Sequence, residues 1–178
     1  MKKYHSPKEF LDAAKSLDTS LDELRELAQA PYVFVQTAVA NHPKADSELL
    51  LALMPQKLET WHEQERATIL AQHPNTTVEI LESLAGMLDS LLDNGREHHL
   101  AFKVGVLLCC NSRTPINAII PLLSPEQSSM QFRKVVARET HRKELLEVLT
   151  LDRSEKVRLM AQKTIMTLLG SSESLLHS

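Results

Sequence analysis

The sequence is poor in glycine, cysteine and aromatic residues. Its 178 residues include 4 glycines and 2 cysteines, and aromatic residues make up 4%. A β-sheet protein needs glycine in its turns and favours aromatic and β-branched residues in its strands. The composition therefore predicts helices. The hydrophobic and charged fractions, 43% and 24%, are typical of a folded globular protein and exclude an intrinsically disordered chain.

Long apolar runs and targeting signals are also missing. No stretch approaches the roughly 20 apolar residues that span a bilayer. The basic residues at the N-terminus are not followed by the apolar segment of a signal peptide. Cys109 and Cys110 are adjacent, so they diverge on a helix, and no second cysteine pair completes a zinc site. We therefore expect a reduced cytoplasmic protein that uses no metal, cofactor or membrane.

Apolar residues recur with the period of an α-helix through most of the chain. Prolines and short polar segments interrupt this period and predict about nine or ten short helices, with no segment that has a strand pattern. The expected loops lie at Pro43, Pro74, Asn111–Thr114 and Thr140. The expected N-cap residues are Asp46, Thr76 or Thr77, Thr114 and Ser154.

The chain contains an internal repeat. Residues 39–53 align without gaps on residues 70–84, at an offset of 31 residues. Two weaker copies follow, and each copy is a helix, a small polar break and a second, capped helix. One such pair cannot bury its apolar face alone, whereas stacked pairs can. The positions that we expect to be equivalent and buried are Val39, Leu70, Leu108 and Val136.

Residues 27–43 resemble a unit of the leucine-rich repeat variant family. A unit of that family has Leu-Ala, two further residues and Pro, and then Val at the fourth position after this Pro. Val-Ala, two further residues and a second Pro follow, and Leu27–Pro43 has the same pattern. Residues 149–161, with Asp152 ahead of Val157 and Arg158, look like the HEAT-type version. The resemblance implies an all-α chain, an α-α superhelix of the HEAT/armadillo kind built from short stacked helix pairs. It covers most of residues 19–168 and says almost nothing about chemistry. The length of the chain predicts one helical repeat domain over residues 1–178.

The last nine residues differ from the rest of the repeat region. Gly170 has the conformational freedom of a residue just past a helix end. Ser171, Ser172 and Ser174 compete for backbone hydrogen bonds and disfavour a helix. We expect the final helix to end near Leu169 and residues 170–178 to form a mobile tail.

Two histidines stand at equivalent places of the repeat, in His42-Pro43 and His73-Pro74. One interpretation is a ladder of metal or phosphate sites. The favoured interpretation is that each imidazole caps the carbonyl groups at a helix C-terminus before proline stops the helix. The weaker copies have Asn111 and Glu139 at this place, which argues against a shared ligand.

Other histidines and the cysteines are weaker candidates. Residues 61–66 lack the second histidine of a zinc-protease helix, because Arg66 takes its place. His98 and His99 are adjacent and diverge around a helix. One interpretation of Cys109 and Cys110 is a redox or metal site. The favoured interpretation is that one of the two cysteines is a small core residue.

The charge distribution is the strongest functional feature. Residues 130–165 carry nine basic and five acidic side chains, whereas residues 1–129 carry 11 basic and 17 acidic ones. Equivalent helices of a superhelix line one concave surface, which would gather the basic residues into a ridge. The alternative is an ordinary solvated face with pairing between successive helical turns. The candidate binding surface consists of Arg133, Lys134, Arg138 and Arg158.

These observations predict a non-enzymatic protein-interaction module that binds a partner protein or peptide on its superhelical surface. No catalytic residue set can be identified in the sequence. The alternative is a protein that binds or processes nucleic acid, resembling the HEAT-like DNA glycosylases and using the C-terminal basic ridge. One tryptophan and two tyrosines offer few platforms for stacking bases. The sequence leaves the partner and the oligomeric state open.

Overall fold

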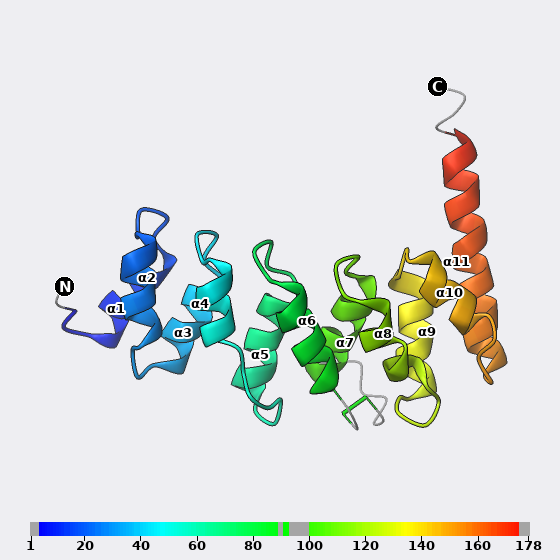
Figure 1. Cartoon of the computed structure of the whole chain (residues 1–178), viewed down its shortest axis with the longest axis horizontal. Helices are drawn as coiled ribbons and strands as arrows, with labels where there is room; N and C mark the ends of the chain where they lie inside the picture. Colours follow the sequence, from blue (N-terminus) through cyan, green and yellow to red (C-terminus); the bar gives the residue numbers. More distant parts are fainter. Residues whose placement is uncertain (1–3, 89–90, 93–99, 175–178) are drawn as a thin grey trace. The chain divides into compact units, whose positions relative to one another are not determined.

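The computed structural model describes residues 4–88, 91–92 and 100–174. In these ranges it contains eleven α-helices, one short 3-10 helix and no β-strand (Figure 1). The all-helical prediction is confirmed. The helices outnumber the prediction because the first of them, α1 (Pro7–Lys15), precedes the apolar faces that the periodicity identified. None of the helices in the described ranges combines the length and the apolar character that crossing a membrane requires.

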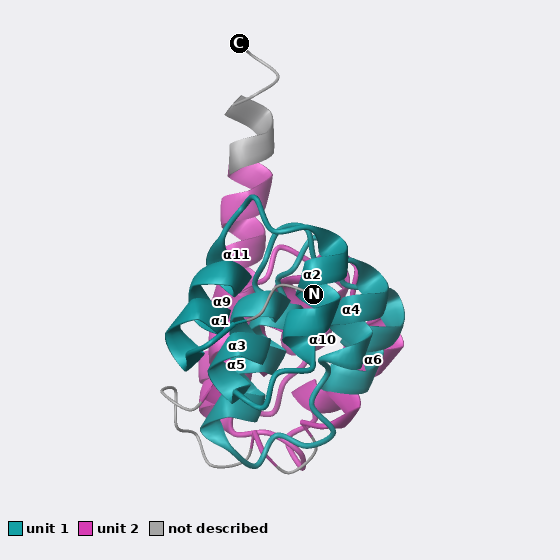
Figure 2. Cartoon of the chain, turned by 90° about the vertical axis from the view of Figure 1, so that its left-hand side faces the viewer, with its two compact units in different colours: residues 1–84 teal, residues 85–178 magenta. Residues whose placement is uncertain are grey.

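The chain divides into two compact units, residues 1–84 and residues 85–178 (Figure 2). The first unit holds α1, α2 (Leu21–Ala28), α3 (Val33–Ala40), α4 (Ser47–Ala52) and α5 (Trp61–Leu70), and α6 (Val78–Gly86) ends just beyond it. The second unit holds α7 (Leu100–Cys110), α8 (Ile116–Ile119), η1 (Pro121–Leu123), α9 (Met130–Glu139), α10 (Lys143–Leu149) and α11 (Glu155–Ser174). One repeat domain over residues 1–178, and its superhelical form, stay predictions.

Short polar side chains cap the starts of several helices. The Asp46 carboxylate accepts a hydrogen bond from the Leu49 N–H at 2.9 Å, which confirms this predicted N-cap of α4. The Thr77 hydroxyl takes the same place before α6, 3.4 Å from the Ile80 nitrogen. The prediction for Thr114 is wrong, because Pro115 is the N-cap residue of α8 and makes no side-chain bond.

Within each unit, alternate helices pack against one another. In the first unit α3 contacts both α1 and α5, and in the second unit α9 contacts both α7 and α11. The predicted equivalent positions lie on α3, α5, α7 and α9, and all four are completely buried: Val39, Leu70, Leu108 and Val136. This confirms the buried face that the repeat predicted.

A glycine allows α7 and α9 to approach closely. A Cβ atom at Gly105 would lie 2.8 Å from Cε2 of Phe132, which is closer than real Cβ contacts. The Phe132 ring therefore occupies the space that a larger residue would fill, and it packs edge-on against Phe102, with ring centroids 5.3 Å apart. This contact fixes the spacing of the two helices that carry the site described below.

The repeated histidines connect successive turns of the first unit. Nε2 of His73 lies 3.1 Å from the carbonyl oxygen of His42, and Nε2 of His42 lies 3.0 Å from the carbonyl oxygen of Ser16. Each Nδ1 accepts the N–H two residues later in its own turn, from Lys44 and Asn75. Nε2 must therefore carry the hydrogen and donate it.

The predicted contact with a carbonyl at a helix C-terminus is confirmed for His42, because Ser16 is the C-cap residue of α1. The helix is, however, an earlier one in the chain. Neither ring caps its own helix, because Nε2 reaches a carbonyl 26 or 31 residues earlier in the chain. In the second unit Thr140 makes the matching contacts: its hydroxyl donates to the Cys109 carbonyl, 31 residues earlier, and accepts from the Arg142 N–H. Glu139, which the sequence alignment places here, is one residue away.

The final helix continues further than expected. α11 runs to Ser174 and includes Gly170, so the predicted helix end near Leu169 is wrong. Extending an existing helix adds one hydrogen bond for each residue that is fixed. The cost of glycine in a helix, about 1 kcal/mol relative to alanine, does not stop it. Residues 175–178 of the expected mobile tail lie outside the described residues.

Candidate binding groove

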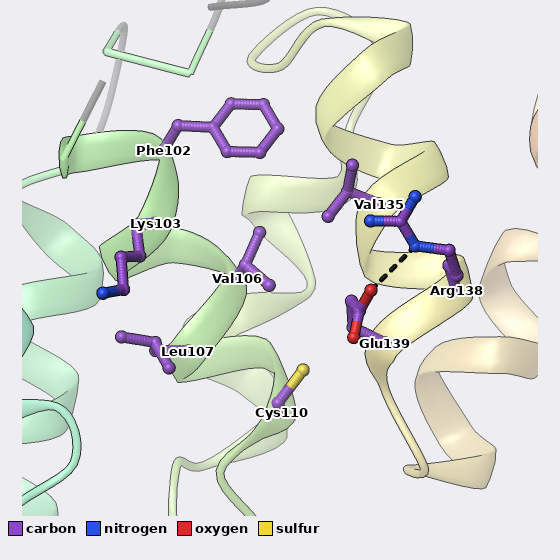
Figure 3. Close-up of a pocket in the computed structure, with 8 residues that line it drawn as sticks. All are labelled: Phe102, Lys103, Val106, Leu107, Cys110, Val135, Arg138 and Glu139. Atoms are coloured by element: carbon purple, nitrogen blue, oxygen red, sulfur yellow. Dashed lines mark hydrogen bonds and ion pairs between the residues drawn. The ribbon is translucent and has the colours of Figure 1, made fainter. Parts of the chain in front are cut away.

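An open apolar groove of about 520 Å³ follows the contact between α7 and α9. We call it the α7–α9 groove; its lining residues are Phe102, Lys103, Val106, Leu107, Cys110, Val135, Arg138 and Glu139. Figure 3 shows Val106 and Val135 facing each other across its centre. Lys103 and Leu107 lie on the side of α7 that is turned away from α9. The groove thus combines an apolar floor with charged side chains at both edges.

Helical periodicity explains why α7 presents this face. Lys103, Val106, Leu107 and Cys110 follow the spacing i, i+3, i+4, i+7 and therefore form one row along the helix. Val106 lies at the edge of this row that faces α9, and Lys103 and Leu107 lie at its outer edge (Figure 3). Val104, Leu108 and Cys109 occupy the opposite side and are completely buried. The groove was not predicted from the sequence. The signal for it is this partly exposed apolar row of α7, which lies opposite the buried row.

The charges at the α9 edge are paired. Nε of Arg138 lies 2.7 Å from Oε1 of Glu139, and both side chains are about half exposed. Lys103 is exposed at the opposite edge. A surface ion pair of this kind contributes little to stability. Arg138 and Glu139 are therefore available to exchange their mutual contact for contacts with a ligand.

The thiols of the two cysteines are not activated as nucleophiles or metal ligands. Burial raises the pKa of the Cys109 thiol well above its usual value, and the adjacent Cys110 adds to this rise. Burial, assisted by the Glu139 carboxylate, raises the pKa of the Cys110 thiol to about 11. Both side chains are therefore protonated at neutral pH, whereas a nucleophile or metal ligand needs the thiolate. The interpretation of Cys109 as a small core residue is confirmed by its complete burial.

The predicted basic ridge does not form as expected, because Arg133 is buried. Its Nε lies 2.6 Å from Oδ2 of Asp152, and its Nη1 donates to the carbonyl of Ser128. The Asp152 carboxylate also accepts the Ser154 N–H at 2.7 Å, so the buried pair is well supplied with partners. Arg133 therefore connects α9 to the turn before α11. The prediction that it lies on the surface is wrong.

The other three residues of the predicted surface have separate environments. Nη1 of Arg158 donates to the carbonyl oxygens of Asp152 and Arg153, at 2.9 and 3.1 Å. Lys134 is half-buried on α9. Arg138 is the one of the four that lines the α7–α9 groove. Its place in a binding surface stays a prediction, and the apolar surface beside it was not predicted.

Among the described residues, no group of three or more histidine, cysteine, aspartate or glutamate side chains is arranged to hold a metal ion. His62 is exposed, and its Nδ1 lies 4.0 Å from the Glu65 carboxylate. His98 and His99 lie outside the described residues.

A second open groove, of about 590 Å³, lies between the η1 segment and the end of α10. Ile120, Val148 and Leu151 contribute exposed apolar side chains to it, and Leu151 is 85% exposed. Arg153 donates to the Pro125 carbonyl at one end. The second unit thus carries two separate apolar grooves with charged edges.

Comparison of the chain with protein families, with curated proteins and with solved structures gave no significant match. The resemblance to leucine-rich repeat variant and HEAT units stays a prediction.

Proposed function

We propose that this protein is a non-enzymatic interaction module that binds a peptide segment of a partner protein in the α7–α9 groove. The observation that carries the proposal is the groove itself, an apolar floor between two helices with Lys103 at one edge and the Arg138–Glu139 pair at the other. Grooves between packed helices that combine apolar anchors with charged edges are a common way to bind peptides.

The lining of the groove indicates the chemistry of the peptide. An aliphatic or aromatic side chain would cover Val106, which is partly exposed, and would contact Val135, which is 8% exposed at the groove surface. A neighbouring aspartate or glutamate would contact Lys103, whose ammonium group is exposed. The second unit carries 12 basic and 10 acidic side chains, so its small positive charge also favours an acidic peptide.

The raised pKa values of the thiols support a binding role. With both cysteines protonated at neutral pH, the groove offers no activated nucleophile beside its apolar floor. Arg138, a residue of the binding surface proposed from the sequence, lines this groove. Its role is to orient a ligand carboxylate beside the anchor, a task for which a planar guanidinium is well suited.

A selection of random peptides against the purified protein tests the proposal. We expect enriched peptides to carry a large apolar residue next to aspartate or glutamate. Val106→Lys should remove binding, because it places a charge on the apolar floor. Lys103→Glu should shift the selection towards peptides with basic flanking residues. Leu151→Ser, which changes an exposed leucine of the other groove, is the matched control and should bind as the parent does.

Two results would contradict the proposal. One is a failure to enrich any peptide. The other is enrichment of peptides that bind the Val106→Lys variant as well as the parent, after circular dichroism has shown that the variant is folded. Binding of duplex DNA with a steep salt dependence, lost in Arg138→Glu, would instead favour the nucleic-acid alternative.

A further inference from the structure

Helix α11 carries two apolar faces. Val157 and Ala161 are completely buried, and the Thr164 hydroxyl on the same side donates to the Ala137 carbonyl at 2.8 Å. This face packs on α9, and α11 also contacts α10. The other face points away from it and carries Leu159 and Met166. A helix that is apolar on both sides is normally covered on both sides.

The outer face is a continuous stripe. Leu159, Met166 and Leu169 are 57%, 73% and 64% exposed, and Gln162 between them is also exposed. We call residues 159, 162, 166 and 169 the α11 stripe. Figure 1 shows the C-terminal half of α11 extending past α9 and α10. Large apolar side chains gathered in this way on a protein surface mark an interaction site.

The spacing of the stripe fits a second copy of α11 as its partner. Its residues are separated by three, four and three positions, which is the a/d spacing of a coiled-coil seam. The four positions are symmetric about residue 164, because 159 and 169, and likewise 162 and 166, are equally far from it along the chain. Two copies of α11 related by a two-fold axis at that level would therefore face each other stripe to stripe. Leu159 would lie opposite Leu169 of the other copy, and Gln162 opposite Met166.

We propose that the protein forms a two-fold symmetric dimer through an antiparallel pair of α11 helices, with the α11 stripe as its seam. This interface is on a different helix from the α7–α9 groove, so it goes beyond the proposed peptide binding and does not depend on it. Gln162 is the polar residue of the seam, and such residues fix the register of a helix pair while lowering its stability.

The size of the stripe limits the strength of the dimer. A stable specific interface buries about 1,600 Å² in total, which is more than a stripe of four residues on each copy supplies. We therefore expect a dissociation constant on the order of 1–100 µM. Lys163 is exposed beside the stripe and close to the two-fold axis, where it meets its own copy. Higher salt screens this repulsion, so the dimer should be tighter at high salt.

Sedimentation equilibrium of the full chain tests the proposal, over concentrations of about 1–300 µM that cover the expected dissociation constant. Met166→Glu should weaken association at least about tenfold, because it brings two carboxylates into an apolar seam. Gln162→Leu should tighten it about tenfold, because it removes the polar residue from the seam. Leu151→Glu is the matched control, a more exposed leucine in the same unit and outside the stripe, and should leave association unchanged.

Disulfide trapping tests the antiparallel register, in a Cys110→Ala background that removes the half-buried thiol. A mixture of Leu159→Cys and Leu169→Cys chains should form a crosslinked pair. Leu159→Cys alone should not, because the two copies of residue 159 would lie about 15 Å apart along the helices. A monomer at every concentration, a dimer unaffected by Met166→Glu, or crosslinking of Leu159→Cys with itself would each overturn the proposal.

Discussion

Nε2 of His73 lies 3.1 Å from the carbonyl oxygen of His42, 31 residues earlier in the chain. This separation equals the offset of the sequence repeat. The same side chain also accepts the Asn75 N–H at Nδ1, so one imidazole satisfies a carbonyl of the preceding turn and an amide of its own. The repeated histidine is thus a link between neighbouring turns of the first unit.

Replacement of His73 by leucine should therefore destabilise the protein. His73→Leu removes the partners of a buried carbonyl and of a backbone N–H, which should cost about 2–3 kcal/mol. Urea denaturation followed by circular dichroism measures this cost. His62→Leu on α5 changes an exposed histidine and should stay within about 0.5 kcal/mol of the parent. Equal effects of the two substitutions would contradict the linking role of His73.

The buried pair of Arg133 and Asp152 predicts a strongly non-additive double substitution. Asp152→Leu leaves a buried guanidinium without its carboxylate and should cost about 3–5 kcal/mol. The double variant Arg133→Met with Asp152→Leu removes both charges and should recover most of that loss. Unfolding free energies of the parent, both single variants and the double variant form the cycle. Additive costs would show that the two side chains do not interact.

Gly105 and Gly170 lie inside helices but should respond to alanine in opposite directions. At Gly105 the added Cβ would meet the Phe132 ring at 2.8 Å, and overpacking of this kind costs about 1–3 kcal/mol. At Gly170 nothing lies within 4 Å, so Gly170→Ala should stabilise α11 by up to about 1 kcal/mol through helix propensity. Thermal melts of the two variants measure these changes, and we expect Tm to fall for Gly105→Ala and to rise for Gly170→Ala. A stabilising Gly105→Ala would mean that α7 and α9 are not in close contact.

The start of α5 should lose stability in acid. Thr60 and Glu63 form a capping box, and hydrogen bonds from the Thr60 backbone, with smaller contributions from its hydroxyl and from Glu59, hold the pKa of the Glu63 carboxyl below its usual value. A lowered pKa in the folded state stabilises the protein above the unfolded pKa of about 4.3, and this contribution is lost as the pH falls through the lowered value.

The variant Glu63→Ala tests this pH dependence. At pH 7 it should be less stable than the parent by about 0.5–1 kcal/mol, the usual value of a cap interaction. The difference should shrink as the pH is lowered below about 4, because the parent then also loses its carboxylate. Denaturation midpoints at a series of pH values provide the measurement. A loss of stability that is constant with pH would show that the ionised Glu63 carboxylate does not stabilise the helix start.

Much of the helical architecture could be predicted because its causes are local. The Asp46 cap depends on residues within one turn of it, and Pro43 and Pro74 interrupt helices through their own backbone geometry. The buried positions Val39 and Leu70 follow from helical periodicity and from their equivalence in the repeat. The end of α11 is harder to predict, because the preferences of glycine and serine against a helix are weak compared with the gain from extending a helix that already exists.

The roles of the charged and polar side chains depended on contacts between distant residues. Arg133 looked like part of a basic ridge, yet Asp152, 19 residues later, draws it into the interior. Thr140 takes the place of the repeated histidine because Cys109 presents its carbonyl 31 residues earlier. The sequence by itself determined which segments are helices and which apolar faces they bury, since both follow from neighbours along the chain. Only the tertiary structure decided which polar groups meet and which helix faces remain open, because those pairings depend on how the helices pack.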